Sequence, residues 1–445
     1  MKNNIKLMAI ALLAGAGLAS CSESDAEKDK GSAPVVKYAR VCDPEKSDSL
    51  IVAASLGSKI AFVGDNLGDV QQVWFNDQKA LLNPVMVTSH TIIVDIPNVI
   101  PGEVNNTARF VTSTGLTAEV PFSVTVPGPR IDKMDCEYTQ PGQQTVLTGA
   151  YFADDPNVPL TVTFPGDMEA QIVSHDQNSI TVKVPEGAKE GPITVSTIYG
   201  KSKSSFHYAD SRGMLFDFEA DGATGLGLDG RCWHAQKLTA DERSLTGTYL
   251  QFGDGETTLN DSSWDDNHFH FEYWSGDWSD PVSYPSRLGD RLFDVADFKD
   301  FKNMSLKFEM LIPSSNPWQT CAMQFIFSGT DKVTYSGGGT DVFGNTVAGS
   351  GNAYFQDDNG KAAGWGRALY RPWSETQAFD TADKWITVSI PLSEFIYNSV
   401  GCKASSSPAS EADFANLEIF VWAGGANGVD STPIICIDNI RAVRN

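Results

Sequence analysis

Positive charge is scarce in this sequence. Its 445 residues include 33 Lys and Arg against 56 Asp and Glu, which gives a formal net charge of −23 at pH 7. A surface this acidic repels phosphate and sulfate groups, so the composition argues against nucleic acid as a partner and disfavours anionic polysaccharides. A neutral ligand fits the charge best.

Catalytic motifs are also missing. The sequence contains no Gly-x-Ser-x-Gly, no His-Glu-x-x-His and no phosphate-binding loop. β-Sandwich glucanases carry Glu-x-Asp-x-x-Glu on one strand, and the nearest approach, at residues 411–416, ends in Asn416 instead of an acid. We therefore expect a non-catalytic protein without a cofactor. Because two carboxylates distant in sequence leave no motif, a β-sandwich endo-glycanase stays an alternative.

The seven cysteines form no CxxC pair and have no histidine at metal-ligand spacing. Besides Cys21, they stand at positions 42, 136, 232, 321, 402 and 436. Export from the cytoplasm permits disulfides, whereas the irregular spacing fits buried thiols equally well. Both interpretations stay open, and no pairing follows from the sequence.

A small-and-apolar run from Leu7 to Leu18 is too short to span a bilayer. Lysines precede it and small residues follow it, which is typical of a secretory signal peptide over residues 1–20. The ending 18–21, Leu-Ala-Ser-Cys, resembles the lipobox of bacterial lipoproteins. That resemblance implies cleavage before Cys21, acyl chains such as palmitate on Cys21, and attachment to a membrane through this lipid anchor alone.

Residues 22–30 are polar and rich in acids. Such a segment cannot bury surface, so we expect residues 21–37 to form a lipidated, flexible tether. An acidic patch behind a lipidated cysteine also resembles the surface-export signal of lipoproteins from glycan-degrading gut bacteria. This resemblance implies a lipid-anchored outer-membrane protein that faces the cell exterior.

Two parts of the first half repeat one another. Residues 57–67 parallel residues 142–152, and residues 91–97 parallel residues 179–185. Both repeats consist of short β-branched stretches at period two, punctuated by Gly and Pro, without helical periodicity. The pattern predicts two small immunoglobulin-like β-sandwiches in tandem.

Each repeat carries a Gly-x-Asn/Tyr-Leu/Phe step and a later Ile-x-Val-x-Ile/Val-Pro run. This combination resembles IPT/TIG domains over residues 38–126 and 130–209. The resemblance implies that the two domains act mainly as spacers. Two prolines within residues 126–129 predict a short, stiff joint between them.

The composition changes in residues 211–445, where nine of the ten tryptophans lie. A core uses tryptophan sparingly because the indole N–H needs a partner, and exposed aromatic side chains mark a binding surface. We therefore expect tryptophans with loop-like neighbours to form platforms for a ligand. The alternative for each of them is that it covers the core as a lid. These candidates are Trp365, Trp373, Trp318, Trp274 and Trp278.

Sugar rings present C–H groups on one face and hydroxyls at the rim, which suits an aromatic platform flanked by amide and guanidinium groups. Tyr370, Arg371 and Asn352 neighbour the loop tryptophans and complete the predicted glycan-binding set. We therefore expect residues 211–445 to bind a neutral plant or fungal polysaccharide. Because tryptophan also serves protein interfaces, a protein-binding surface adhesin is a second alternative.

The last domain opens with Phe-Asp-Phe-Glu at 216–219 and closes with Ile-Asp-Asn-Ile-Arg at 437–441. These ends resemble the paired terminal strands of jelly-roll carbohydrate-binding modules. In several such families acids from the two strands hold a structural Ca²⁺, and Glu219 and Asp438 stand at the matching positions. Solvated acids are commoner at strand ends, so no metal is predicted and the two residues are weak candidates.

The whole chain resembles the surface glycan-binding lipoproteins of starch-utilisation-type (Sus-like) uptake loci, and specifically the B-type with IPT/TIG-like domains and a xyloglucan-binding-like C-terminal domain. The resemblance implies an all-β chain, in which two tandem immunoglobulin-like sandwiches precede a C-terminal jelly-roll-like sandwich. It also implies that xyloglucan, another β-glucan or a β-mannan is bound and presented for uptake and degradation, with a SusC/SusD-like transporter complex and surface glycanases as partners.

Overall fold

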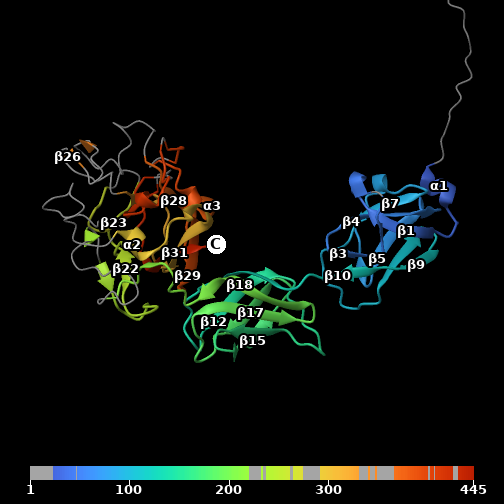
Figure 1. The fold of residues 1–445 in the computed structure, drawn as a ribbon, viewed down its shortest axis with the longest axis horizontal. Coiled ribbons are helices and arrows are strands. Elements are labelled where there is room, and N and C mark those ends of the chain that lie inside the picture. Colours follow the sequence, from blue (N-terminus) through green and yellow to red (C-terminus); the bar gives the residue numbers. More distant parts are fainter. Residues whose placement is uncertain are drawn as a thin grey trace, which may run out of the picture. The chain divides into compact units, whose positions relative to one another are not determined.

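The structure is a computed structural model of the chain. It describes residues 24–46, 48–219, 232–233, 237–260, 264–273, 291–329, 339–340, 346–347, 365–398, 401–404, 406–423 and 429–445. The chain divides into two compact units, Met1–Pro127 and Gly128–Asn445 (Figure 1). Both units are built almost wholly from strands, so the all-β prediction is confirmed. Within the described part, no helix is long and apolar enough to cross a membrane.

The first unit contains two four-stranded antiparallel sheets, with strand orders β2-β1-β4-β7 and β6-β5-β8-β9. Phe62 in the first sheet contacts Phe75 and Phe110 in the second, with ring centroids 6.0 and 4.8 Å apart, so the core lies between the sheets. A parallel pair, β3 with β10, completes the unit. The strands are β1 (Val35–Val41), β2 (Leu50–Ile51), β3 (Ala53–Ser55), β4 (Lys59–Asp65), β5 (Val70–Phe75), β6 (Gln78–Lys79), β7 (Thr91–Asp95), β8 (Thr107–Thr112), β9 (Thr117–Pro121) and β10 (Ser123–Thr125).

The second unit begins with another sandwich of two four-stranded sheets, ordered β11-β12-β16-β15 and β14-β13-β17-β18. Leu147, Val162, Ile180 and Val195 are fully buried between these sheets. The strands are β11 (Arg130–Met134), β12 (Gln144–Ala150), β13 (Thr161–Phe164), β14 (Met168–Glu169), β15 (Gln171–His175), β16 (Ser179–Lys183), β17 (Gly191–Thr197) and β18 (Gly200–Tyr208).

The repeated sequence segments occupy equivalent strands in the two sandwiches, because β4 lies between β1 and β7 as β12 lies between β11 and β16. Register shifts interrupt β1 and β11 opposite a glycine of the repeat, Gly64 in β4 and Gly149 in β12. A Cβ added at either glycine would clash with a carbonyl oxygen of the neighbouring strand. Two residues later, Asn66 and Tyr151 adopt left-handed φ angles of 56° and 62°. The Gly-x-Asn/Tyr step is therefore a backbone requirement of the bulge and the turn after it.

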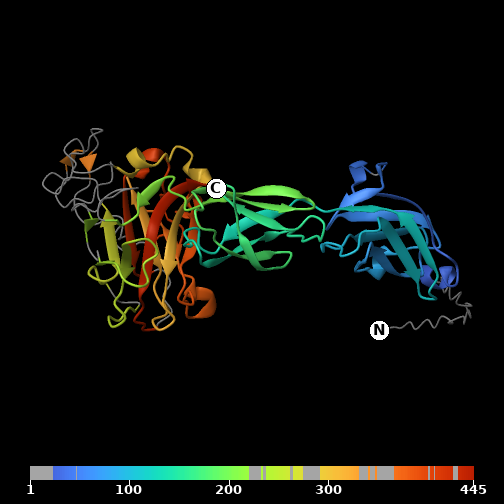
Figure 2. The same ribbon diagram turned by 90° about the horizontal axis from the view of Figure 1, so that it is seen from below.

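The C-terminal sandwich consists of two larger sheets, and Figure 2 shows its strands, yellow to red, running alongside one another. One sheet has the order β21-β22-β31-β24-β29, with β19 also paired to β31, and the other has the order β20-β23-β30-β25-β28. The strands are β19 (Met214–Phe216), β20 (Cys232–Trp233), β21 (Lys237–Thr239), β22 (Tyr249–Phe252), β23 (His270–Tyr273), β24 (Met304–Leu311), β25 (Met323–Ser328), β28 (Ala368–Tyr370), β29 (Ile386–Pro391), β30 (Asn416–Val421) and β31 (Ile435–Arg444).

Aromatic contacts join the two sheets of the C-terminal sandwich. Phe216 on β19 meets Phe271 on β23 at a ring-centroid distance of 5.4 Å, and Phe308 on β24 meets Phe325 on β25 at 5.1 Å. The remaining regular elements are short: β26 (Gly339–Thr340), β27 (Thr346–Val347), α1 (Asp25–Asp29), α2 (Leu292–Val295), α3 (Trp373–Thr376), and the 3-10 turns η1 (Pro44–Lys46), η2 (Pro84–Met86), η4 (Phe301–Asn303), η6 (Leu392–Glu394) and η7 (Glu411–Asp413).

Arg441, fully buried in β31, joins the C-terminal sandwich to the sandwich before it. Its guanidinium donates to the Glu309 carboxylate on β24 (Nη1–Oε2 2.8 Å) and to the Glu137 carboxylate in the loop after β11 (Nη2–Oε2 2.7 Å). Lys307 donates to the other Glu137 oxygen at 2.6 Å. Two cations thus balance two buried carboxylates, which offsets much of the cost of removing these charges from water.

Main-chain hydrogen bonds reinforce this junction. The Thr387 N–H donates to the Asp135 carbonyl oxygen at 2.7 Å, and the Glu137 N–H donates to Thr387 Oγ1 at 2.7 Å. The Tyr138 hydroxyl donates to the Asp210 carbonyl oxygen, also at 2.7 Å. These bonds hold the loop that carries Glu137 against β29.

The predicted flexible tether over residues 21–37 differs from the structure in its described part. The Ser24 side chain caps α1, accepting from the Glu27 N–H at 3.3 Å. The Asp29 carboxylate accepts from the Gly68 N–H at 2.8 Å, and the Asp25 carboxylate accepts from the Ser89 N–H at 3.1 Å. The prediction fails from residue 25 onward because these acids bind main-chain donors of the first unit, which composition cannot reveal.

The structure resolves part of the open question about cysteine. Cys42, Cys136, Cys321, Cys402 and Cys436 form no disulfide, and Cys136, Cys321 and Cys436 are buried. Among the described side chains, cysteine therefore behaves as a small apolar residue and not as a cross-link.

The junction network leads to a prediction for stability. Replacing Arg441 with Met leaves Glu309 and Glu137 buried without their guanidinium, so the free energy of unfolding should fall by about 3–5 kcal/mol. Denaturant unfolding of the whole protein measures this loss, and Arg444→Met, at an exposed position of the same strand, is the matched control. A loss of less than about 1 kcal/mol in Arg441→Met would contradict the assigned role.

Candidate functional site

The sheet β20-β23-β30-β25-β28 has one apolar face and one polar face. Its apolar face supplies Phe271, Ile419 and Phe325 to the core. On the other side, cross-strand pairing aligns polar and aromatic residues, because Phe420 pairs with both His270 and Gln324, while Glu418 pairs with Glu272. We call this side the polar face, and it carries His270, Glu272, Gln324, Arg367, Glu418, Phe420 and Trp422.

Two carboxyl groups lie opposite each other at the centre of the polar face. Glu272 and Glu418 are paired residues on adjacent strands and are only 4% and 2% exposed. Burial raises the pKa of Glu272 to about 7. Burial and repulsion from Glu272 raise the pKa of Glu418 well above its usual range. Near neutral pH the pair therefore holds at least one proton, so it offers both a donor and acceptors.

A guanidinium and an amide are held in fixed orientation beside this pair. Arg367, with no exposed surface, donates from Nη1 to Gln324 Oε1 at 2.9 Å. Gln324 in turn donates from Nε2 to the Trp422 carbonyl oxygen. The positive charge of Arg367 counteracts the upward shift in the pKa of Glu418. Arg367 and Gln324 are both fully buried, so this pair supports the sheet and does not itself reach solvent.

An aromatic cluster borders the polar face. Trp264 packs edge-on against Phe420 and Trp422, with ring centroids 4.9 Å apart in both contacts. The His270 ring stacks on Phe420 at 4.7 Å. Trp264 is 46% exposed, and among the tryptophan side chains that the structure describes it is the one most open to solvent. An exposed indole next to oriented polar groups suits the apolar face of a neutral sugar ring.

Three of the predicted platform tryptophans are instead core residues. Trp318, Trp365 and Trp373 are 0%, 6% and 3% exposed. Each indole N–H donates to a main-chain carbonyl oxygen at 2.6 to 2.7 Å, and the acceptors are Thr320, Phe327 and Cys321 respectively. The prediction was wrong because a main-chain acceptor inside the core satisfies each indole N–H, so a loop-like neighbourhood does not imply exposure.

Two other predicted residues line a pocket of about 260 Å³ between β28 and β29. The ring centroids of Tyr370 and Trp318 are 6.1 Å apart. Burial raises the pKa of the Tyr370 hydroxyl to about 12. Arg371 is exposed at the same place. The other members of the predicted set, Trp274, Trp278 and Asn352, lie outside the described residues.

Sequence reasoning missed most of the polar face and the exposed Trp264. The signal was present as alternation, since residues 416–422 read Asn-Leu-Glu-Ile-Phe-Val-Trp and residues 270–273 read His-Phe-Glu-Tyr. Apolar residues at every second position mark the core face, and the intervening polar and aromatic residues mark the opposite face. Arg367 had no such signal, because its partner Gln324 is 43 residues away.

The weak metal candidates lie at neighbouring places in the fold. Glu219 accepts from the Thr248 N–H at 3.1 Å, and Asp438 accepts from the Thr246 hydroxyl at 3.2 Å. Burial and the negative charge of Glu309 raise the pKa of Asp438 to about 9. A neutral carboxyl is a poor metal ligand. Glu219 and Asp438 therefore stay weak candidates for a metal site.

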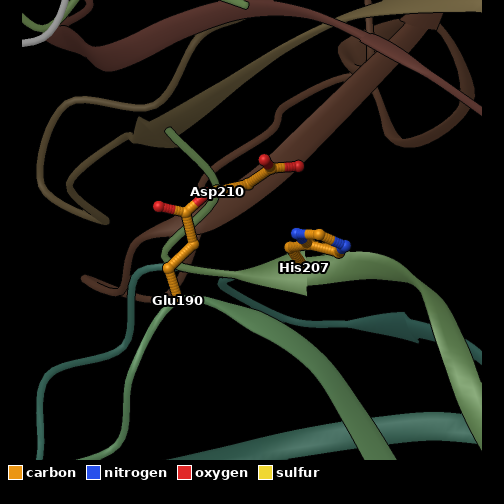
Figure 3. A group of neighbouring side chains, drawn as sticks. All are labelled: Glu190, His207 and Asp210. Carbon is orange, nitrogen blue, oxygen red and sulfur yellow. The ribbon is translucent and has the colours of Figure 1, made fainter. Parts of the chain in front are cut away.

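A different trio in the described residues has metal-ligand atoms within 4.8 Å of one another: Glu190, His207 and Asp210 (Figure 3). Both carboxylates are already engaged. Asp210 accepts two hydrogen bonds from Arg212, at 2.7 Å each, and Glu190 accepts from the Ser211 hydroxyl at 2.6 Å. The Arg212 charge also lowers the pKa of His207, after desolvation as the main cause. A cation beside this guanidinium is disfavoured, so the trio is a structural network.

Comparison with known proteins identifies the family of the C-terminal domain. Residues 208–444 match the family model described as "Surface glycan-binding protein B xyloglucan binding domain". The chain belongs to this family of surface glycan-binding proteins. The family model and the matching structure are both described as surface glycan-binding proteins, which confirms the prediction of a non-catalytic surface protein.

Similar proteins extend the comparison beyond that domain. The chain is 40% identical to the crystal structure of surface glycan-binding protein PbSGBP-B from Prevotella bryantii, with a TM-score of 0.75, and the match covers 93% of this chain and 99% of that one. An IPT/TIG domain-containing protein from Bacteroides ovatus is 30% identical over 213 residues, which are 44% of this chain and 42% of that protein. The chain therefore spans less than half of that relative, and the predicted resemblance to glycan-binding proteins with IPT/TIG domains is confirmed.

The burial of Trp365 gives a test of its corrected role. Trp365→Ala removes a core side chain and its hydrogen bond, so the free energy of unfolding should drop by about 3–5 kcal/mol. Chemical unfolding followed by fluorescence measures this, with Trp74→Ala in the first unit as the half-buried control. A stable Trp365→Ala protein that has lost only glycan binding would restore the original prediction.

The carboxyl pair on the polar face predicts a pH dependence. The folded pKa of Glu272, about 7, exceeds its ordinary value of 4.5, so the folded state binds more protons between these values. The stability that Glu272 contributes is therefore fully present below about pH 4.5 and is lost as pH rises through 7, by about 3 kcal/mol. Urea unfolding from pH 5 to 8 measures the slope, which should flatten in Glu272→Gln. A slope unchanged by this substitution contradicts the assignment.

Proposed function

We propose that this chain is a lipid-anchored outer-membrane protein that binds a neutral β-glucan, with xyloglucan as the first candidate, and presents it for uptake. The observation that carries the proposal is the aromatic cluster, in which the exposed Trp264 borders a sheet face of oriented polar groups. The family description supplies xyloglucan as the ligand to test first. Other β-glucans and β-mannans share the same ring geometry.

Recognition would combine stacking with hydrogen bonding. The Trp264 indole covers the C–H face of one sugar ring, and the half-buried Trp422, which meets it edge to face, supports that indole. Side chains beside Trp264 supply polar partners, among them His268, which is held by the Asp265 carboxylate at 2.9 Å. No net charge is needed on the ligand, which agrees with the acidity of the whole chain.

The anchor and the partners rest on sequence. The lipobox at residues 18–21 supports lipidation of Cys21, and the acidic residues that follow it support display on the cell exterior. By family resemblance, a SusC/SusD-like transporter complex and surface glycanases would receive the bound chain. The sandwiches over 38–126 and 130–209 would serve as spacers between the anchor and the binding domain.

The proposal is tested by replacing the exposed indole. In native gels that contain xyloglucan, mixed-linkage β-glucan, laminarin, galactomannan or pectin, the wild-type protein should be retarded by a neutral glycan. Trp264→Ala should weaken that binding at least about tenfold, equivalent to about 1.4 kcal/mol, because the stacking surface is lost. Its Tm should stay close to that of the wild type, since the side chain is half exposed.

Two controls make the result specific. Trp74→Ala removes a half-buried tryptophan from the first unit and should leave retardation unchanged, whereas Trp264→Phe should restore part of the binding. Unchanged binding by Trp264→Ala would exclude the aromatic cluster as the site. Retardation by pectin alone would contradict the neutral-ligand proposal.

A further inference from the structure

The first unit exposes an apolar segment that its fold does not use. Leu81 is 93% exposed, Val85 is 84% exposed and Met86 is 41% exposed. They lie between β6 and β7, within a run from Ala80 to Ser89 that contains no ionisable side chain. The three side chains are strongly exposed for apolar residues, and exposed apolar groups gathered on one segment mark a contact surface.

The segment has a defined backbone conformation, which capping and turn hydrogen bonds stabilise. Asn83 caps η2 by accepting from the Val85 N–H at 3.1 Å, and Pro84 occupies the first position of that turn. The Met86 N–H donates to the Asn83 carbonyl oxygen at 2.8 Å. The backbone of η2 thus fixes the positions of Val85 and Met86, which lowers the entropy cost of any contact they make.

The same end of the unit receives the chain from the proposed anchor. Asp25 in α1 accepts from the Ser89 N–H at 3.1 Å, three residues beyond Met86. Helix α1 also lies close to Gly68, where an added Cβ would clash with the Asp25 carbonyl oxygen. Asp25 is the fourth residue after Cys21, so the main chain between them spans at most about 14 Å when extended. Because helix α1 is bound to the first unit, only a short stretch of chain connects the proposed lipid to this end of the unit.

We propose that Leu81, Val85 and Met86 insert into the outer leaflet of the membrane that holds the Cys21 lipid, and so fix how the first unit stands on the bilayer. The inference rests on the proposed lipid anchor. Apolar side chains carried on an uncharged segment enter the interfacial zone readily, whereas the acidic remainder of the chain is repelled from anionic headgroups. The acyl chains supply the attachment, and the segment supplies the orientation.

The test uses the full-length lipoprotein in vesicles of phosphatidylethanolamine and phosphatidylglycerol at a ratio of about three to one, a composition that presents an anionic surface. In a Cys42→Ser/Cys402→Ser background, Leu81→Cys carries an environment-sensitive fluorophore, and the background protein is the blank. Leu50→Cys is the matched control, because Leu50 is also strongly exposed, at 68%. Leu50 pairs with Arg40 on β1, five residues from Val35, and so lies at the end of the strand opposite the contact with α1. Emission and quenching by spin-labelled lipid are recorded for both.

We expect a blue shift and at least twofold stronger lipid quenching at position 81 than at position 50. Equal quenching at both positions, with all proteins floating with the vesicles, overturns the insertion while leaving the anchor intact. Failure to float overturns the anchor and the insertion together. A blue shift on intact cells without lipid quenching assigns the segment to a protein partner, and it also overturns the membrane proposal.

Discussion

The guanidinium of Arg441 is the interaction on which the second unit depends. It lies in β31, a strand flanked by β22 and β24, and it reaches one carboxylate within its own sheet and another in the preceding sandwich. If this buried guanidinium is removed, a buried carboxylate in each of the two domains loses its opposite charge. The sandwich at residues 130–208 is for this reason part of the structural support of the glycan-binding domain as well as a spacer.

The polar face uses the other sheet of the same domain in a different way. Both of its sides are buried, so exposure alone does not distinguish them, and only the chemistry of alternate residues does. The side toward the core is aliphatic and aromatic. The opposite side holds a carboxyl pair and an amide that accepts a hydrogen bond from a guanidinium. A sheet built in this way holds its polar groups rigidly inside the domain, and the exposed Trp264 at its border is the side chain open to a ligand.

How far the sequence predicted this protein can be judged from particular residues. The repeat around Gly64 and Gly149 identified equivalent strands because glycine and left-handed φ are local requirements that leave a local trace. The tryptophans could not be placed in this way. Trp365 bonds to Phe327 and Trp373 to Cys321, which are 38 and 52 residues away, so only the folded chain brings donor and acceptor together. The same holds for Asp25, whose partner Ser89 is 64 residues distant.

The buried thiols have a consequence for the chemistry of the core. Cys136 and Cys436 are buried, and desolvation keeps the pKa of Cys136 far above that of an ordinary thiol, so it resists conversion to a reactive thiolate. Oxidants and alkylating reagents attack the thiolate form. Cys136 therefore remains a neutral and unreactive side chain while the fold is intact, although it lies close to the charged groups of the junction.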